Sequence, residues 1–155
     1  ALAGLGAPYW NPYARGAIMG LTRGTSIAQV VRAGLEGMCF QVNDLISAMN
    51  QDADHSMTIL RVDGGATVNN QLMQIQANYS NLPVDRPQII ETTAFGSGLF
   101  AAMGVGLFAG LSDIADLRLK DKVFEPDAAH HTRRAEHLAG WERAVRAVEV
   151  FAGKS

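Results

Sequence analysis

A short stretch in the middle of the chain combines residue types that can bind an anion or a nucleotide. An apolar run over residues 57–62 stops at Asp63, Gly64 and Gly65, and a segment with helical periodicity follows. Amide groups at the start of a helix point outward with partial positive charge, and glycine lets a ligand touch the backbone. Asn69, one turn further on, can reach the same ligand. Two alternatives remain: the glycines only form a tight turn, and Asp63 is either a turn residue or a metal ligand.

Two other glycine motifs match nucleotide-binding loops only in part. Gly153-Lys154-Ser155 imitates the end of a P-loop, but Val148 stands where the first glycine belongs. Gly104, Gly106 and Gly110 miss the spacing of a dinucleotide-binding loop by one residue, and they do not follow an expected strand. We therefore expect neither motif to bind a nucleotide.

Groups that can bind a metal or transfer a proton are sparse. His130, His131 and His137 invite a metal-binding interpretation, but their segment is polar and has no cysteine, so a surface cluster is expected. Glu36 and Asp44 lie on one expected helix, and one helix alone does not define an acid–base pair. We assign no metal ligand and no catalytic residue.

The composition is that of a globular protein. Of the 155 residues, 48% are hydrophobic and 18% are charged, which excludes global disorder. A formal net charge of -2 gives no general attraction to nucleic acid or anionic lipid, so neither is an expected partner. The single cysteine, Cys39, has apolar neighbours and is expected to be an inert buried thiol in a reducing compartment.

Hydrophobic periodicity predicts strands that alternate with helices. Apolar residues recur every three or four positions through residues 25–50, with Thr25 or Ser26 as the N-cap, which indicates a long amphipathic helix. The other expected elements are strands over residues 14–21, 57–62 and 84–86, an exposed strand or extended connector over residues 120–126, helices over residues 67–79 and 132–151, and a helical turn over residues 112–117. This order predicts an α/β domain with helices packed on a sheet.

Three of these elements carry a more specific expectation. Thr67 is a plausible N-cap for the helix after the glycines. Pro83 and Pro87 bracket the strand over residues 84–86, which is expected near a sheet edge because proline cannot donate into a strand ladder. The 21 residues from 92 to 112 carry no charge but contain five glycines, so we expect a helix buried on nearly all sides rather than a membrane span.

At several motifs the sequence resembles the C-terminal part of the FGGY carbohydrate kinases, over essentially the whole chain. The stretches Gly4-Leu-Gly-Ala-Pro-Tyr-Trp-Asn-Pro-Tyr-Ala-Arg-Gly16 and Gly20-Leu-Thr-Arg-Gly24 are similar to the segment that marks the glycerol-phosphorylating members. The adenosine motif of the family is matched by Leu60-Arg-Val-Asp-Gly-Gly-Ala66 with Asn69. Glu91-Thr-Thr-Ala94 and Ala139-Gly-Trp141 match as well.

The resemblance implies an actin-like ATPase fold of the ribonuclease H-like type, with residues 1–155 as an incomplete part of the C-terminal, ATP-binding lobe. It implies ATP-dependent phosphorylation of glycerol to glycerol 3-phosphate with Mg²⁺. By position, Gly65 and Asn69 would contact ATP, with Gly64 and Ala66 shaping the turn. The family's general base and most of its glycerol pocket lie upstream of the residues present here, so the isolated chain is expected to be inactive.

The resemblance also implies partners and leaves other functions open. The N-terminal lobe of the same enzyme is the expected partner, in a cytoplasmic protein that forms homo-oligomers. One alternative is another FGGY kinase acting on a pentulose, which the stretch from Gly4 to Gly24 disfavours. A second alternative is a non-catalytic remnant that binds a nucleotide or a partner.

Overall fold

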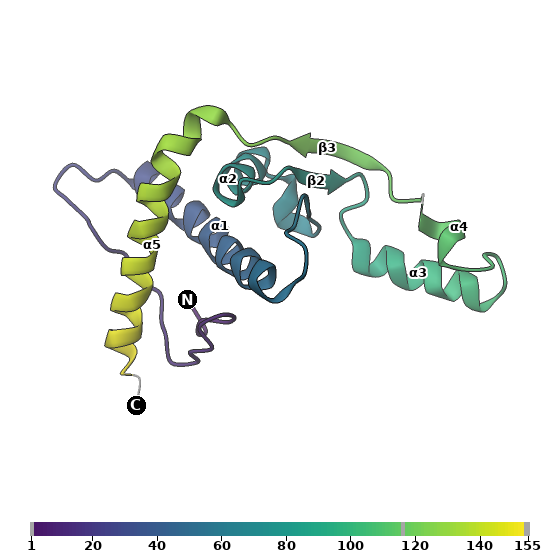
Figure 1. Ribbon diagram of the computed structural model, residues 1–155, viewed down its shortest axis with the longest axis horizontal. Helices are drawn as coiled ribbons and strands as arrows, with labels where there is room; N and C mark the ends of the chain where they lie inside the picture. The colour runs from purple at the N-terminus through teal and green to yellow at the C-terminus, as the bar shows by residue number, and fades with distance from the viewer. Residues whose placement is uncertain (1, 116, 154–155) are drawn as a thin grey trace.

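The computed structural model describes residues 2–115 and 117–153, and its helix α2 packs against both the long helix α1 and a small sheet (Figure 1). The described helices are α1 (Ile27–Asp52), α2 (Asn70–Ser80), α3 (Thr92–Gly104), α4 (Leu111–Ala115) and α5 (His131–Ala152). The strands are β1 (Leu60–Arg61), β2 (Val84–Pro87) and β3 (Lys120–Phe124), and the short 3₁₀ helices are η1 (Gly65–Val68) and η2 (Ala128–His130). The predicted α/β class and most predicted elements are confirmed.

Helix α1 begins where the sequence predicted, because its first turn forms a capping box. The backbone N–H of Gln29 donates to Ser26 Oγ at 3.3 Å, and the backbone N–H of Ser26 donates to Gln29 Oε1 at 2.7 Å. This reciprocal pair satisfies N–H groups that have no partner inside the helix. Ser26, rather than Thr25, is therefore the N-cap.

The sheet has the order β1-β2-β3, with β2 parallel to β1 and antiparallel to β3. Val84 pairs with Leu60 on one side and with Phe124 on the other. The prediction that residues 84–86 lie at a sheet edge is therefore wrong, because β2 is the central strand. Pro87 is tolerated because it is the last residue of β2, where the register with β3 shifts between Arg86 and Pro87.

The main core lies between α1, α2 and the sheet, and α5 closes one side of it. The ring of Phe40 on α1 packs 4.5 Å from that of Tyr79 and stacks 5.5 Å from that of Trp141 on α5. The buried core residues are Cys39, Phe40, Leu72, Met73, Ala77, Tyr79, Val84 and Phe124. Cys39 is a buried thiol, as predicted, and its burial raises the pKa of the thiol to about 12.

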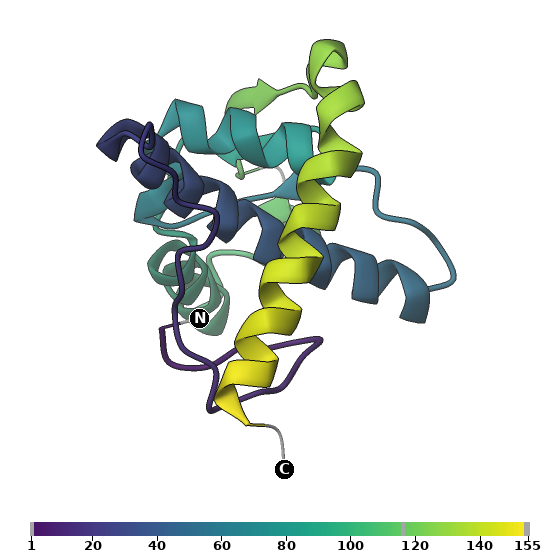
Figure 2. The same ribbon diagram turned by 90° about the vertical axis from the view of Figure 1, so that its left-hand side faces the viewer.

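The N-terminal segment is attached to both long helices through one carboxylate. Tyr9 Oη donates to Asp44 Oδ2 at 2.8 Å, and Trp141 Nε1 donates to the same oxygen at 2.6 Å. Leu5 and Ala14 are buried in a second small cluster with Val145 of α5. Figure 2 shows the purple N-terminal segment beside the C-terminal half of the yellow helix α5.

The strand predicted over residues 14–21 is wrong. This segment is irregular and swings out at the left of Figure 1, away from the sheet. Ile18 is 63% exposed and Leu21 is 60% exposed. A strand requires backbone partners, and within the described residues no strand lies beside this segment.

The buried helix predicted over residues 92–112 is also wrong, in length and in burial. Helix α3 ends at Gly104, and Gly106 with φ of 78° separates it from α4. No described residue of α3 is buried, and Phe100 is 64% exposed. Figure 1 shows the reason: α3 and α4 lie beyond the ends of β2 and β3, away from α1, α2 and α5. Among the described residues, no helix combines the length and apolar character needed to cross a bilayer.

Candidate functional site

The candidate site is the turn that connects β1 to α2, where the sequence placed a nucleotide-binding motif. Gly64 has φ of 83° and ψ of 166°, a combination that is essentially restricted to glycine. Its N–H donates to the carbonyl oxygen of Ile90 at 2.8 Å, which fixes the start of the turn. Strand β1 covers only Leu60–Arg61 of the predicted 57–62 and ends three residues before Gly64, so the glycines follow the strand, as predicted, but do not mark its last residue.

The sequence predicts a helix directly after the glycines, but the glycines do not lead directly into α2. Residues Gly65–Val68 form the 3₁₀ helix η1, in which Thr67 Oγ1 donates to the Gly64 carbonyl at 2.7 Å. Thr67 is therefore not the N-cap of α2, and that prediction is wrong. The N-cap is Asn69, whose Oδ1 accepts from the N–H groups of Gln71 at 3.0 Å and Leu72 at 3.1 Å.

This local arrangement changes which groups can meet a ligand. The N–H groups of Gln71 and Leu72 are already bound to Asn69 and do not point to a free anion site. Gly65 and Ala66 are the first two residues of η1, and the N–H groups at the start of a helix have no acceptor within it. No other acceptor for these two N–H groups lies among the described residues. The turn therefore presents two unpaired, uncharged donors.

Asn69 and the glycines complete this donor face. With its Oδ1 committed to the cap, the Nδ2 group of Asn69 has no acceptor among the described residues. A Cβ built on Gly64 or Gly65 would meet no atom within 4 Å, so the face of the turn is open. The structure thus brings the predicted site residues Gly64, Gly65, Ala66 and Asn69 into one turn, which has unpaired hydrogen-bond donors and is uncrowded at both glycines.

Asp63 connects the start of the turn to α3. The hydroxyl of Thr92, the first residue of α3, donates to Asp63 Oδ2. Sequence reasoning left Asp63 either as a turn residue or as a metal ligand, and the contact shows that it has a structural partner. Among the residues that the structure describes, no three His, Cys, Asp or Glu side chains gather as a metal site.

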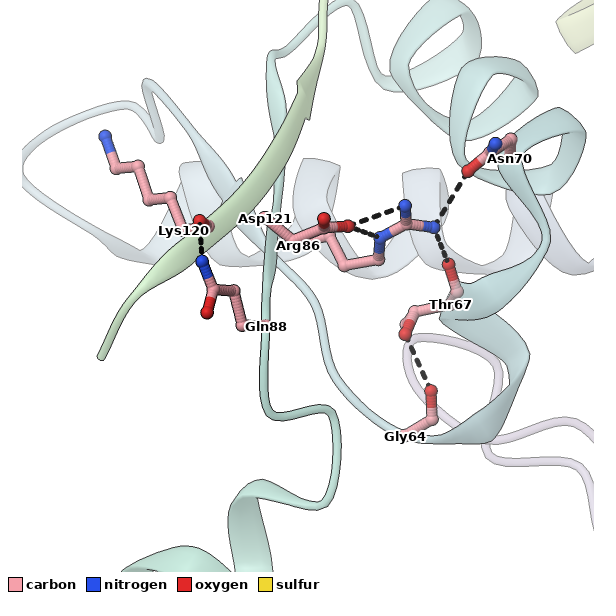
Figure 3. A network of polar contacts seen from close by, with 7 residues as sticks. All are labelled: Gly64, Thr67, Asn70, Arg86, Gln88, Lys120 and Asp121. Carbon is pink, nitrogen blue, oxygen red and sulfur yellow. Dashed lines mark hydrogen bonds and ion pairs between the residues drawn. The ribbon is translucent and has the colours of Figure 1, made fainter. Parts of the chain in front are cut away.

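A polar network behind the turn was missed by the sequence analysis (Figure 3). Arg86 of β2 donates through Nη1 to the Thr67 carbonyl at 2.7 Å and to Asn70 Oδ1 at 2.9 Å. Its Nε and Nη2 both lie 2.7 Å from Asp121 Oδ2 on β3. The available signal was an arginine in a predicted strand, but its partners are set by strand pairing that local sequence does not specify.

The neighbouring Asp85 is fully buried and also escaped sequence analysis. Its Oδ2 lies 2.8 Å from Nη1 of Arg118 and 3.8 Å from Nε of Arg61. Arg118 Nη2 also donates to the Asp85 carbonyl at 3.1 Å. This pair attaches the chain segment after α4 to the central strand, so it supports the sheet beside the candidate site.

Within residues 2–115 and 117–153, the remaining motifs form no second site. Gly153 is the C-cap of α5, while Lys154 and Ser155 lie outside the described residues. The histidine cluster predicted at the surface is only partly right, because His137 Nδ1 lies 2.6 Å from Tyr79 Oη. Two hollows run along α1 and α5, lined by residues such as Asp44 and Trp141, and neither includes a residue of the glycine turn.

The chain is similar to kinases in both sequence and structure. It is 50% identical over 145 residues to a glycerol kinase from Agathobacter rectalis and 48% identical over 146 residues to glycerol kinase 1 from Clostridium tetani. Each match covers 94% of this chain and 29% of the relative, so the chain spans less than a third of the length of these relatives.

Solved structures of kinases share the fold of this chain. The structure of Plasmodium falciparum glycerol kinase with ADP matches with a TM-score of 0.81 and 31% identity, over 96% of this chain and 30% of that one. Gluconate kinase from Lactobacillus acidophilus matches with a TM-score of 0.81 and 25% identity, over 95% of this chain and 30% of that one. These matches confirm the expected actin-like ATPase fold.

The family follows from the match to a model of the C-terminal domain of carbohydrate kinases. That model covers residues 1–105, which is more than half of the sequence. The motifs that carried the resemblance, from Gly4 to Ala94, all lie within these residues, apart from the one that ends at Trp141. The chain therefore belongs to the FGGY family of carbohydrate kinases.

Proposed function

We propose that this chain forms part of the ATP-binding lobe of a kinase that phosphorylates glycerol to glycerol 3-phosphate. The observation that carries the proposal is the donor face of the turn, where the N–H groups of Gly65 and Ala66 and the Nδ2 of Asn69 are unpaired. Relatives named as glycerol kinases and a similar structure that contains ADP support this choice.

The chemistry of the donor face suits the nucleoside part of ATP. Ring nitrogens and ribose oxygens are hydrogen-bond acceptors, and the turn offers uncharged donors to meet them. Glycine at positions 64 and 65 leaves open space in which a ligand can approach the backbone. In this proposal Gly65, Ala66 and Asn69 bind the nucleotide, and Gly64 holds the turn in its unusual conformation.

The proposal assigns no catalytic or metal-binding residue to this chain. Phosphoryl transfer requires an acceptor hydroxyl held in line and charge neutralised on the transferred group. Mg²⁺ commonly binds one or two carboxylates together with substrate phosphates, and the donor face formed by Gly65, Ala66 and Asn69 carries no carboxylate. We therefore propose that the general base, the rest of the glycerol pocket and the metal contacts belong to other parts of the full-length kinase.

We also propose that residues 1–155 work as part of a larger C-terminal lobe, with an N-terminal lobe closing over ATP and glycerol. Relatives more than three times as long as this chain support the proposal. So do exposed apolar side chains on α3 and in the loop that follows it, among them Phe100 and Leu107. Assembly into a homo-oligomer and a cytoplasmic location remain predictions. Turnover of ATP and glycerol by the purified chain 1–155 would contradict the assignment of catalysis to other parts.

The central experiment separates the two functions of Asn69 in the full-length kinase. Asn69→Ser keeps an oxygen that can cap α2 but replaces the Nδ2 donor with a hydroxyl one bond closer to the backbone, whereas Asn69→Ala removes both the cap and the donor. Loss of one uncharged hydrogen bond should raise the KM for ATP about two- to tenfold in both variants, with an unchanged KM for glycerol. Only the alanine variant should also lose about 1 kcal/mol of stability from the missing cap.

Gln71→Ala is the matched control, because Gln71 is exposed on the first turn of α2 and its side chain makes no hydrogen bond or ion pair in the described structure. It should leave both Michaelis constants unchanged. An unchanged KM for ATP in Asn69→Ser would reject the site. Faster phosphorylation of xylulose than of glycerol would instead favour a pentulose kinase. We expect this outcome less, because the chain is 25% identical to xylulose kinase from Lactobacillus acidophilus but 50% identical to a glycerol kinase.

A further inference from the structure

We infer that Arg86 is a positioning residue that fixes η1 and the start of α2 relative to the central strand, and so aligns the donor face proposed to bind ATP. The inference rests on the proposed function, because it concerns the same turn. Arg86 lies on the central strand β2, and Figure 3 shows its side chain reaching across to η1 and to the start of α2. Arg86 is not part of the donor face itself.

The contacts of Arg86 lie on either side of Asn69. Its Nη1 donates to the Thr67 carbonyl, near the end of η1, at 2.7 Å, and to Asn70 Oδ1, at the start of α2, at 2.9 Å. One nitrogen therefore connects the last part of the turn and the first residue of the helix to the same strand. Both bonds therefore oppose a displacement of η1 relative to the first residue of α2.

The other side of the guanidinium is fixed by β3. Nε and Nη2 both lie 2.7 Å from Asp121 Oδ2, and the guanidinium carbon lies 5.2 Å from the centre of the Phe124 ring. The Arg86 side chain is 12% exposed, so it has little room for another position. Four contacts from one planar group need the fork geometry of arginine, which the single ammonium of lysine does not reproduce.

Arg86 holds the end of the turn, while other residues hold its beginning. The Gly64 N–H donates to the Ile90 carbonyl oxygen at 2.8 Å, and the Thr67 hydroxyl donates to the Gly64 carbonyl oxygen within the turn. Helix α2 keeps its own cap at Asn69 and its own packing against α1, so the fold does not depend on Arg86 alone. The free donors of Gly65 and Ala66 lie between these two attachments, and their alignment with Asn69 depends on both.

The test uses Arg86→Lys and Asp121→Asn in the full-length kinase, with Arg32→Lys as the control. Arg32 makes a comparable contact to Glu36, at 2.8 Å, but on the exposed face of α1. If Arg86 positions the turn, Arg86→Lys should raise the KM for ATP about three- to tenfold. The KM for glycerol and kcat at saturating ATP should stay within twofold of wild type, and Arg32→Lys should change nothing. Asp121→Asn should cause a smaller change in the same direction.

A purely structural role would give a different pattern. In that case Arg86→Lys would lower the unfolding temperature or reduce kcat without changing the KM for ATP, and the inference would be overturned. The double variant Arg86→Lys with Asp121→Asn should be no worse than Arg86→Lys alone, because both changes break the same connection. If the increases in the KM for ATP of the two single variants add up in the double variant, Arg86 and Asp121 do not act through the same contact. A raised KM in Asn69→Ser with an unchanged KM in Arg86→Lys rejects only the role of Arg86, whereas an unchanged KM in Asn69→Ser rejects the proposed site.

Discussion

Replacing Gly64 by alanine should weaken the structure around the turn, whereas the same replacement at Gly65 should not. Gly64 has φ of 83° and ψ of 166°, a region that costs other residues about 1–3 kcal/mol. Gly65 has no such conformation, and a Cβ at either position would meet no atom within 4 Å. The two variants thus add the same methyl group to equally open space and differ only in backbone strain.

Hydrogen exchange of the β1 and α2 amides in the full-length kinase measures this difference, because it reports local opening even in a protein with several lobes. A cost of about 1–3 kcal/mol corresponds to about 5- to 150-fold faster exchange in Gly64→Ala. Gly65→Ala should exchange as slowly as wild type or more slowly, since alanine at a compatible position restricts the unfolded chain. Equal exchange rates in the two variants would refute the strain assigned to Gly64.

The same pair also distinguishes strain from ligand contact. The Gly65 methyl would stand on the donor face, so Gly65→Ala should raise the KM for ATP although its stability is unchanged. Gly64→Ala should affect stability first and ATP binding only through displacement of the turn. If Gly65→Ala binds ATP as well as wild type, the nucleotide does not approach the backbone at this residue.

The remaining predictions concern buried ionisable groups. Burial raises the pKa of Cys39 from 9.0 to about 12, so the folded state keeps a proton that the unfolded state loses. The contribution of the Cys39 thiol to stability is complete below pH 9.0 and declines as the pH rises toward 12. Cys39→Ser should therefore flatten the alkaline fall in the free energy of unfolding. An unaltered pH profile of this free energy would contradict the prediction. Asp85→Asn should lower the free energy of unfolding by about 3 kcal/mol, the low end for a broken buried pair because Arg118 is 27% exposed. Urea denaturation checks this value, and a loss below about 1 kcal/mol would show that Arg118 finds water or another partner.

Helices with strong local signals were predictable from the sequence. Ser26 and Gln29 form a capping box within four residues, so the start of α1 is a local property. The turn was also predictable in outline, because Gly64 adopts a conformation that few other residues accept. The N-cap was harder to predict, because Thr67, Asn69 and Asn70 are all residues that favour caps or turns. Only the geometry of η1 selects Asn69.

The failures share a physical cause, which is that strands and buried helices depend on partners distant in the sequence. Residues 14–21 alternate like a strand, but no described strand pairs with them. Helix α3 is apolar enough for a core, yet Phe100 remains 64% exposed. The central position of β2 and the contacts of Arg86 with Asp121 likewise arise only when β3 pairs with β2, and these two residues are 35 positions apart in the sequence.

The chemistry of the turn limits which kinetic constants this chain can control. Its free donors, on Gly65, Ala66 and Asn69, are uncharged, and the nearby guanidinium of Arg86 is already bound to Asp121 and Thr67. Uncharged donors at a nucleoside interact equally with the ground state and the transition state, because charge develops at the transferred phosphoryl group and not at the base or ribose. Such uniform binding lowers KM without raising kcat. Under the proposed function, substitutions in this turn should therefore change the KM for ATP, while kcat is set by residues in other parts of the kinase.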